Sequence, residues 1–458
     1  MSIIANKARS AYLKTLQTSA RLDLPWLAAI MISALITRKK PAATTPCYSI
    51  VILPKDGFTQ DIMSALSGAD DVEVLALPRL VLRELFRAFL PNSVDDNNYA
   101  SAGSEFDQAK SRYRNFLRRV FKTLQRFRKI DAVVTGNFGY RAERELASAM
   151  SDLGIPFIAL HKENLKTPGR VAFFEHIYKE RRGPFTGRSI LVYNKIEKDL
   201  QLRAAVAEPE QIQIVGMPRL DRIHDWRRAN AGAATPRQIL FFLFSPLTGM
   251  PRIVRKGATA GEVYLEDDGS DDSDNSISLD KLYAETCRTI LAIAREHPDI
   301  EVVVKTKGRQ RDIVESAGPF GLEGEQSPPP NLRIVHSGDV LPLIAQASVV
   351  CGFNSTALLE SVAAGKPVVL PWFEEAERAD VQPYVIDLRA LGDVARNPAE
   401  LHDLLIKHAL SPRPIPAELA ENETATLDHW TGNVDGHASE RTRRAILAAI
   451  DEQLKSSR

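Results

Sequence analysis

Residues 349–371 read V-V-C-G-F-N-S-T-A-L-L-E-S-V-A-A-G-K-P-V-V-L-P, and they give the clearest indication of the fold class. The apolar run that ends at Cys351 predicts a buried strand. The polar residues at 354–356 are of the kind that begin helices. The Gly-Lys-Pro sequence at 365–367 ends that helix before a second apolar run. A strand, a helix and a further strand in this order form a crossover unit with parallel strands, which predicts an α/β fold.

The turn before this helix has the features of an anion site. Gly352 lets the backbone approach a ligand closely. Asn354, Ser355 and Thr356 offer side-chain polar groups and free amide N–H groups at a helix N-terminus, which favours phosphate. Glu360 lies one turn further along. The same residues also suit an ordinary, well-capped βαβ unit, so the residue pattern leaves both interpretations open.

The same alternation of strands and helices extends over most of the chain. Apolar helical periodicity is clearest at residues 111–130, and a further helix is expected at 279–296. Short apolar runs predict parallel strands at residues 48–53, 72–77, 132–135, 156–160, 189–193, 212–215, 239–244, 301–305 and 332–335.

The alternation restarts near residue 239, which indicates two doubly wound, Rossmann-like domains. We expect an N-terminal domain at residues 46–228 and a C-terminal domain at residues 229–395. Residues 1–45 are predicted to be an N-terminal helical extension, and residues 396–458 to be C-terminal helices.

Composition excludes several classes of protein. Of the 458 residues, 44% are hydrophobic and 26% charged, which is ordinary for a globular protein. The three cysteines, Cys47, Cys287 and Cys351, are far apart and form no C-x-x-C pair, so neither a disulfide framework nor a zinc site is suggested. A reducing, cytoplasmic setting is therefore expected. No nucleic-acid partner is predicted.

The charge is unevenly distributed. Residues 1–130 hold 20 Lys/Arg against 11 Asp/Glu, although the whole chain carries only +1. This indicates contact with an anionic lipid or a phosphate-bearing acceptor, or simply an uneven solvated surface. Residues 24–36 are apolar but shorter than the ~20 residues that cross a bilayer. Either they lie in the membrane interface with Trp26 as an anchor, at the inner face of the cell membrane, or they pack on the first domain.

Residues 349–371 resemble the donor-domain signature of GT-B glycosyltransferases of bacterial capsule and lipopolysaccharide synthesis. They are also similar to the CDP-glycerol glycerophosphotransferase-like enzymes of wall-polymer synthesis. In these families, small polar residues before the helix hold the donor phosphates, and an acidic residue on or near it often holds the ribose. The resemblance implies the phosphate role for Ser355 and Thr356, beside Gly352 and Asn354, and the ribose role for Glu360.

Residues 302–308, V-V-V-K-T-K-G, are similar to a segment of several capsule and wall-polymer transferases in which a K-x-H-P pattern follows the corresponding strand. Lys305 fits this pattern, whereas Lys307 and a glycine replace His-Pro. Lys305, Lys307 and Arg309 either neutralise donor phosphates or form a solvated basic loop. Ser245, at the end of strand 239–244, is a further donor-side candidate.

Residues 216–221, G-M-P-R-L-D, are similar to a G-x-P-R-x-D element at the domain junction of the same families. The similarity implies an anion contact for Arg219, and a structural Arg–Asp pair is the alternative. Lys55 and Asn137 each follow a predicted strand and are candidates for the acceptor side.

The catalytic candidates follow strand 156–160. The wall-polymer transferases carry H-G-T in a similar place, where this chain has His161, Lys162 and Glu163. Histidine ordinarily titrates near neutral pH and can remove a proton from an acceptor hydroxyl. Glu163 either orients His161 or is itself the base.

These features predict a metal-independent glycosyltransferase that moves a sugar from a nucleotide-activated donor to a growing surface polysaccharide or lipid-linked glycan. No metal and no cofactor is predicted, because basic side chains and helix ends can take the leaving-group charge, and the acidic run at residues 267–274 is a poor metal cage. The alternatives are a glycerol- or ribitol-phosphate transferase and a nucleotide-sugar epimerase of the same fold. From another class, a non-catalytic, membrane-associated glycan-binding scaffold also fits.

Overall fold

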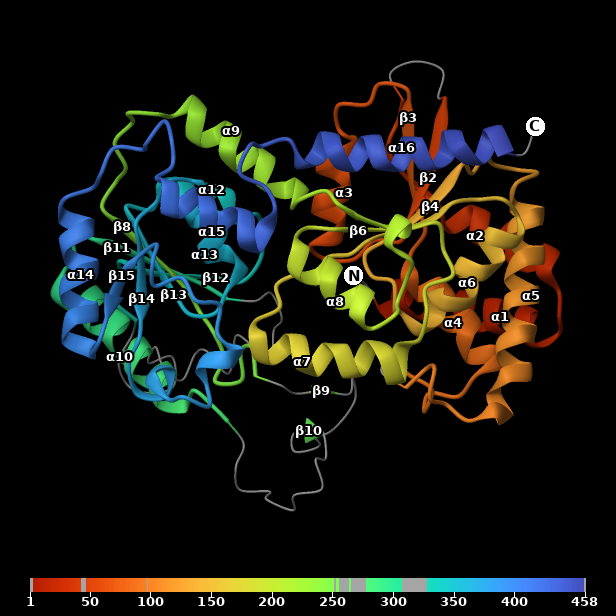
Figure 1. The fold of residues 1–458 in the computed structure, drawn as a ribbon, viewed down its shortest axis with the longest axis horizontal. Coiled ribbons are helices and arrows are strands. Elements are labelled where there is room, and N and C mark those ends of the chain that lie inside the picture. The colour runs from red at the N-terminus through yellow and green to blue at the C-terminus, as the bar shows by residue number, and fades with distance from the viewer. Residues whose placement is uncertain are drawn as a thin grey trace. The chain divides into compact units, whose positions relative to one another are not determined.

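The computed structural model describes residues 3–42, 47–96, 98–250, 253–254, 263–264, 277–306 and 328–456 (Figure 1). These residues form two compact units of α/β structure. Unit 1 comprises segments 1–164, 174–221 and 430–458, and unit 2 comprises segments 165–173 and 222–429.

Unit 1 is built on a seven-stranded sheet in the order β1-β3-β2-β4-β5-β6-β7. Edge strand β1 is antiparallel to β3, and the other strands are parallel. The parallel strands are short apolar runs, as expected of a sheet covered on both faces. The strands are β1 (Thr37–Lys40), β2 (Tyr48–Ile52), β3 (Val72–Ala76), β4 (Ala132–Thr135), β5 (Phe157–Leu160), β6 (Ser189–Val192) and β7 (Ile212–Ile214).

The helices of unit 1 bury apolar faces against this sheet and one another. The C-terminal helix α16 packs on α3, and its residues Ile446 and Ile450 join the core formed by β2–β5 (Figure 1). The helices that lie wholly in this unit are α1 (Ile3–Arg21), α2 (Pro25–Leu35), α3 (Phe58–Leu66), α4 (Arg79–Phe89), α5 (Asp107–Leu124), α6 (Arg141–Asp152), α8 (Lys195–Arg203) and α16 (Ala438–Ser456).

Unit 2 is built on a six-stranded parallel sheet in the order β12-β11-β8-β13-β14-β15. Its strands are β8 (Gln238–Phe242), β11 (Glu301–Lys305), β12 (Leu332–Val335), β13 (Val349–Gly352), β14 (Val368–Pro371) and β15 (Asp393–Ala395). Its helices include α10 (Asp280–Glu296), α12 (Leu341–Gln346), α13 (Thr356–Ala363) and α14 (Pro398–Leu410). A separate pair of two-residue strands, β9 (Ile253–Val254) and β10 (Val263–Tyr264), is antiparallel.

The chain passes from one unit to the other at four points, and three of them lie within helices α7 (Pro168–His176), α9 (Asp221–Ala229) and α15 (Glu421–Thr431). In the part of the chain that the structure describes, no helix is both long and apolar enough to cross a membrane.

The strand order confirms the predicted fold class of two doubly wound α/β sheets. Each parallel strand predicted from an apolar run is present, with ends that differ by no more than two residues. The grouping of the chain differs from the predicted segments at both ends. Residues 37–40, which belong to the predicted helical extension, form edge strand β1, and the predicted C-terminal helices divide between unit 2 and unit 1. The reason for the second difference is the apolar face of α16, which is buried on α3.

Candidate functional sites

Each sheet has one point at which the strand order reverses. In unit 1 the chain runs from β2 to β3 on one side and continues with β4 on the other, so the reversal lies between β2 and β4. In unit 2 it lies between β8 and β13. Open α/β sheets bind ligands beyond the carboxyl ends of the strands at such a switch point. We call the edge where the parallel strands end the carboxyl edge.

The register of unit 2 brings the predicted donor residues to its carboxyl edge. Lys305 of β11 pairs with Phe242 of β8, and Phe242 pairs with Gly352 of β13. The loops that follow these three strands therefore leave the sheet side by side. Ser245 lies three residues beyond β8, and Asn354 lies two residues beyond β13. Both sides of the switch point thus carry a predicted residue.

Asn354 fixes the turn at this switch point. Its φ of 50° lies in the left-handed region, which asparagine tolerates better than most residues. Its Nδ2 donates to the carbonyl oxygens of Thr248 (3.1 Å) and Tyr384 (3.0 Å), and its Oδ1 accepts from the N–H of Ile386 (3.0 Å). The side chain is thus engaged by backbone groups. Asn354 ties the loop after β8 to the loop after β13, which is a scaffolding role within the predicted site.

The first turn of α13 supplies unpaired donors. Ser355 is its N-cap, and the Ser355 Oγ accepts from the N–H of Ala357 at 3.3 Å. Among the described residues, the hydroxyl of Thr356 and the N–H groups of Ser355 and Thr356 have no hydrogen-bond partner. Glu360, one turn along the helix, is buried. A helix start with free N–H groups is a site at which an anion can bind.

Lys305 adds a cation at the same edge. It is largely buried, its Nζ donates to the carbonyl of Thr306 at 2.8 Å, and burial lowers the pKa of the Lys305 ammonium. A cation that has lost much of its hydration is stabilised by a nearby anion. Lys307 and Arg309, predicted beside Lys305, lie outside the described residues.

Two polar residues at this edge were not among the site residues predicted from the sequence. Thr306 and His336 directly follow β11 and β12, and Thr306 Oγ1 lies 3.0 Å from His336 Nδ1. Their position next to a strand end was the available signal. Ser245 is exposed, and its hydroxyl lies 3.1 Å from the hydroxyl of Thr248.

The carboxyl edge of unit 1 gathers charged side chains around an aromatic ring. Lys55, in the loop after β2, donates from Nζ to the Tyr140 hydroxyl at 2.7 Å and lies 4.3 Å from the centre of the Tyr140 ring. The guanidinium of Arg79, after β3, lies 3.7 Å from the centre of the same ring. Arg79 also pairs with the buried Glu143, whose pKa is raised by burial. Arg79 was not among the site residues predicted from the sequence, although it too follows a strand.

Glu163 is held at this edge by the loop after β4. Asn137 Nδ2 donates to Glu163 Oε2 at 3.2 Å, and Lys162 Nζ lies 3.6 Å from Glu163 Oε1. The N–H of Lys162 donates to the carbonyl of Gly136 at 3.1 Å, which fixes the loop after β5 against the loop after β4. The side chain of Glu163 is 37% exposed. Its carboxylate is therefore oriented and also accessible.

His161 lies in the interior of unit 1. Its side chain is 0% exposed, and its Nε2 lies 3.1 Å from Glu197 Oε1 and 3.5 Å from the Tyr178 hydroxyl. Its ring lies 5.4 Å from the ring of Phe138, and its Nδ1 has no partner among the described residues. This position differs from the one expected of a base that meets an acceptor hydroxyl. Of the two catalytic candidates, Glu163 is the accessible one.

Arg219 takes part in an ion pair within unit 1. Its Nη1 lies 3.0 Å from Oδ2 of Asp61, which is buried on α3, and 3.3 Å from the Tyr193 hydroxyl. The partner is not the neighbouring Asp221, whose carboxylate accepts from the N–H groups of Ala438 and Ser439 at the start of α16. The structural Arg–Asp pair that was the alternative for this element is thus present, with a different aspartate.

Comparisons with known proteins give structural neighbours only. No family model and no curated protein matches the chain. A putative UDP-N-acetylglucosamine 2-epimerase from Listeria monocytogenes is 13% identical, with a TM-score of 0.48 over 88% of this chain and 97% of that one. The UDP-GlcNAc 2-epimerase from Neisseria meningitidis is 11% identical, with a TM-score of 0.46 over 88% and 99%. The wall teichoic acid polymerase TagF is 12% identical, with a TM-score of 0.44 over 99% and 100%.

At these identities and TM-scores the likeness carries no argument about activity. The assignment of the fold rests on the strand order and register of the two sheets, and the candidate sites rest on their switch points.

Proposed function

We propose that this chain is a glycosyltransferase that moves a sugar from a nucleotide-activated donor to a growing cell-surface polysaccharide or lipid-linked glycan. The observation that carries the proposal is the first turn of α13. Its donors, the N–H groups of Ser355 and Thr356 and the Thr356 hydroxyl, have no acceptor among the described residues, and they lie at the switch point of a doubly wound sheet. Such a turn is best suited to binding the diphosphate group of a nucleoside diphosphate.

The proposal assigns the donor to unit 2. The N-terminus of α13 and the partly dehydrated ammonium of Lys305 stabilise the negative charge that builds up on the departing nucleotide diphosphate. Glu360, one helical turn beyond, is assigned to a ribose hydroxyl. Asn354 keeps the turn in its left-handed conformation, so the donors are oriented before the ligand arrives.

The proposal assigns the acceptor to unit 1. Glu163 removes the proton from the acceptor hydroxyl as the acceptor oxygen bonds to the anomeric carbon and the bond from that carbon to the phosphate oxygen breaks, which releases the nucleotide. Asn137 and Lys162 orient the Glu163 carboxylate. Lys55 and Arg79 offer positive charge to an acidic or phosphate-bearing acceptor. His161 pairs with the buried Glu197 and thereby anchors the start of the loop that carries Glu163.

The test compares wild type with Glu163→Gln against a panel of UDP-, GDP-, CMP- and CDP-activated donors. We expect Glu163→Gln to lower turnover by about 100-fold or more and to leave the dissociation constant of the donor unchanged. Glu175→Gln is the matched control, because Glu175 is a partly exposed carboxylate of the same unit that pairs with Arg203. Full turnover in Glu163→Gln would contradict the role of Glu163.

Product analysis with labelled donors tests the reaction class. Transfer of the sugar to a glycan supports the proposal. Release of an epimerised nucleotide-sugar, or transfer of glycerol phosphate, would replace it with one of the related activities. Donor binding without any product would identify a scaffold.

We further propose that unit 1 contacts an anionic membrane surface through α2. One face of α2 packs in unit 1 through Ala28 and Ile32, whereas Trp26 is 54% exposed and Ile30, one turn away, is also exposed. Helix α5, which packs on α2, carries the exposed basic residues Arg118, Arg119 and Lys122, and the exposed Arg126 follows two residues after its end. Apolar side chains beside basic ones are typical of an interfacial helix.

Sedimentation with lipid vesicles tests this contact. We expect binding to phosphatidylglycerol vesicles, weaker binding to phosphatidylcholine vesicles, and a loss of about tenfold in Trp26→Ala. Leu454→Ala, which removes an exposed apolar side chain on α16, is the control. Equal binding of the wild type to both vesicle types would exclude an electrostatic contact.

A further inference from the structure

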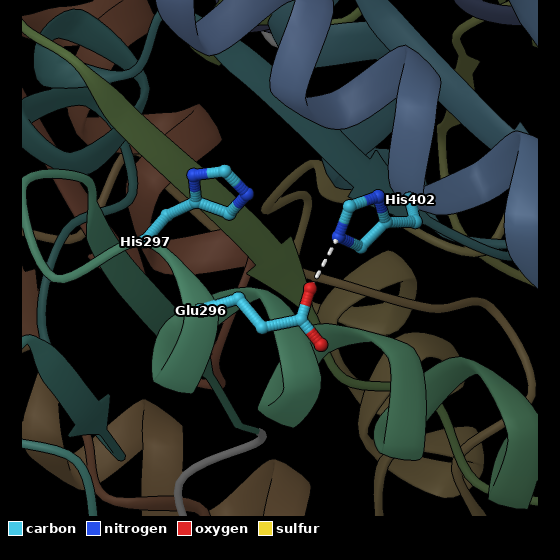
Figure 2. A group of neighbouring side chains, drawn as sticks. All are labelled: Glu296, His297 and His402. Carbon is cyan, nitrogen blue, oxygen red and sulfur yellow. Dashed lines mark hydrogen bonds and ion pairs between the residues drawn. The ribbon is translucent and has the colours of Figure 1, made fainter.

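Three potential metal ligands come together where α10 meets α14. Glu296 is the last residue of α10, His297 follows it, and His402 lies on α14. One ligand atom from each residue lies within 4.8 Å of those of the other two. Figure 2 shows the carboxylate of Glu296 directed at the ring of His402, with the ring of His297 facing the same space. The group lies entirely in unit 2 and shares no residue with the donor-side edge.

The two histidines are positioned by further contacts. His402 Nε2 lies 3.1 Å from Glu296 Oε2, while its Nδ1 lies 3.3 Å from Oδ1 of Asp403. A carboxylate on the far nitrogen of a histidine is the usual support of a metal-bound imidazole, because it fixes the ring and the tautomer. The carbonyl of His297 accepts from Asn331 Nδ2 at 3.0 Å, which holds the backbone of His297 beside the start of β12.

The spacing of these atoms suits a transition ion. Ligands at about 2.0–2.2 Å around a tetrahedral zinc ion lie about 3.3–3.6 Å from one another. Glu296 Oε2 and His402 Nε2 are already 3.1 Å apart, and a ring nitrogen of His297 lies within 4.8 Å of both ligand atoms, so a change of its side-chain rotamer brings it into range. Two imidazoles and one carboxylate form a familiar zinc ligand set that leaves one position for water. The side chains of Glu296 and His402 are both partly exposed, so an ion can enter.

We propose that Glu296, His297 and His402 form a binding site for a divalent transition-metal ion, with zinc as the best-fitting probe. The ion joins the end of α10 to α14. These helices bury Leu282, Ile290, Leu401 and Leu405 in the core of unit 2, so the ion locks an existing packing contact. Glu296 and His297 precede β11, whereas Lys305 closes it at the carboxyl edge. The site therefore has a structural role and lies apart from the proposed chemistry.

The test measures Zn²⁺ binding to the full chain, stripped with EDTA, by isothermal titration calorimetry. We expect one site per chain that is weakened at least about tenfold in His402→Ala and in His297→Gln, and about tenfold in Asp403→Asn. Bound Co²⁺ should give the visible absorption of a tetrahedral site in wild type, and this absorption should disappear in both histidine variants. Zn²⁺ should also raise the melting temperature of wild type alone.

The matched control is His437→Ala. His437 is exposed and its Nδ1 lies 3.9 Å from Glu440 Oε2, but it belongs to no group of three potential metal ligands among the residues that the structure describes. Zn²⁺ affinity should be unchanged in this variant. Melting curves in EDTA show whether each variant is folded. If a histidine variant is unfolded, Glu296→Gln is used in its place to remove one ligand of the site. Zn²⁺ binding that is equal in wild type, His297→Gln and Glu296→Gln, or absent from wild type, overturns the proposal.

Discussion

The carboxyl edges of the two units differ in the groups that they present. In unit 2 the edge is formed largely by backbone groups, namely the start of α13 and the turn that Asn354 locks. In unit 1 it is formed by charged side chains, including Lys55, Arg79 and Glu163. Backbone donors suit a ligand of fixed shape and charge, such as a diphosphate. Long side chains at the edge can be substituted by other residues without altering the sheet beneath them. Under the proposed function, the edge of unit 2 therefore serves anion binding and the edge of unit 1 serves the acceptor.

The largest effect on stability is expected from the buried ion pair between Asp61 and Arg219 in unit 1. Replacing Asp61 by Asn leaves Arg219 without its buried carboxylate. We expect a loss of about 3 kcal/mol in the free energy of unfolding, since removing one partner of a buried ion pair strands the other. Urea denaturation measures this loss. Asp225→Asn, which affects an exposed pair with Arg228, should change the free energy by less than about 0.5 kcal/mol.

A smaller effect is expected in unit 2 from Asn354→Ala. The change leaves two carbonyls and one N–H without the amide partner and puts alanine at a φ of 50°. We expect a loss of about 2 kcal/mol in stability together with weaker donor binding. Asn422→Ala, which removes an exposed amide that donates to Ala390, is the control. Unaltered donor affinity would show that the turn is not part of the donor site.

Lys305→Met tests the cation at the edge of unit 2. The substitution keeps the buried stem of the side chain and removes the ammonium. We expect nucleotide-diphosphate affinity to fall about tenfold, as measured by calorimetry, because one charge-assisted contact is lost. Lys281→Met, at an exposed lysine of the same unit, should leave affinity unchanged. If Lys305→Met and Lys281→Met bind the nucleoside diphosphate with equal affinity, Lys305 is not part of the anion site, and the first turn of α13 alone forms it.

Thr356→Val should have the smallest effect. It removes one hydroxyl that has no partner among the described residues and leaves the N–H groups of α13 in place. We expect about a fivefold loss in donor affinity and no loss of stability. Thr289→Val, at a hydroxyl that donates to the carbonyl of Glu285 within α10, is the matched control. A loss as large as that of Lys305→Met would mean that side chains dominate this edge too.

Apolar patterning explains how much could be predicted from the sequence. Buried parallel strands such as β4 and β13 are short apolar runs, so the alternation predicted the fold class. Strand β1 escaped detection because its T-R-K-K sequence is largely exposed, as on many charged sheet edges. Arg79 and His336 could have been proposed from their positions after a strand.

Other features depend on packing that no local pattern encodes. The burial of His161 follows from its contact with Glu197 on α8, 36 residues away by the numbering, and the ion pair of Arg219 joins residues 158 positions apart. Glu296 and His402 are separated by 106 positions and meet because α10 packs on α14. A sequence search for closely spaced ligands does not detect such a group.

The position of α16 in unit 1 has a consequence for biosynthesis. Ala445, Ile446, Ala449 and Ile450 of this helix belong to the same core as β2–β5, yet the ribosome makes them after all of unit 2. Unit 2 can therefore finish folding on the nascent chain while unit 1 still exposes the strip of apolar surface that α16 will cover. During that interval the part of the chain that is made first is the part most in need of a chaperone.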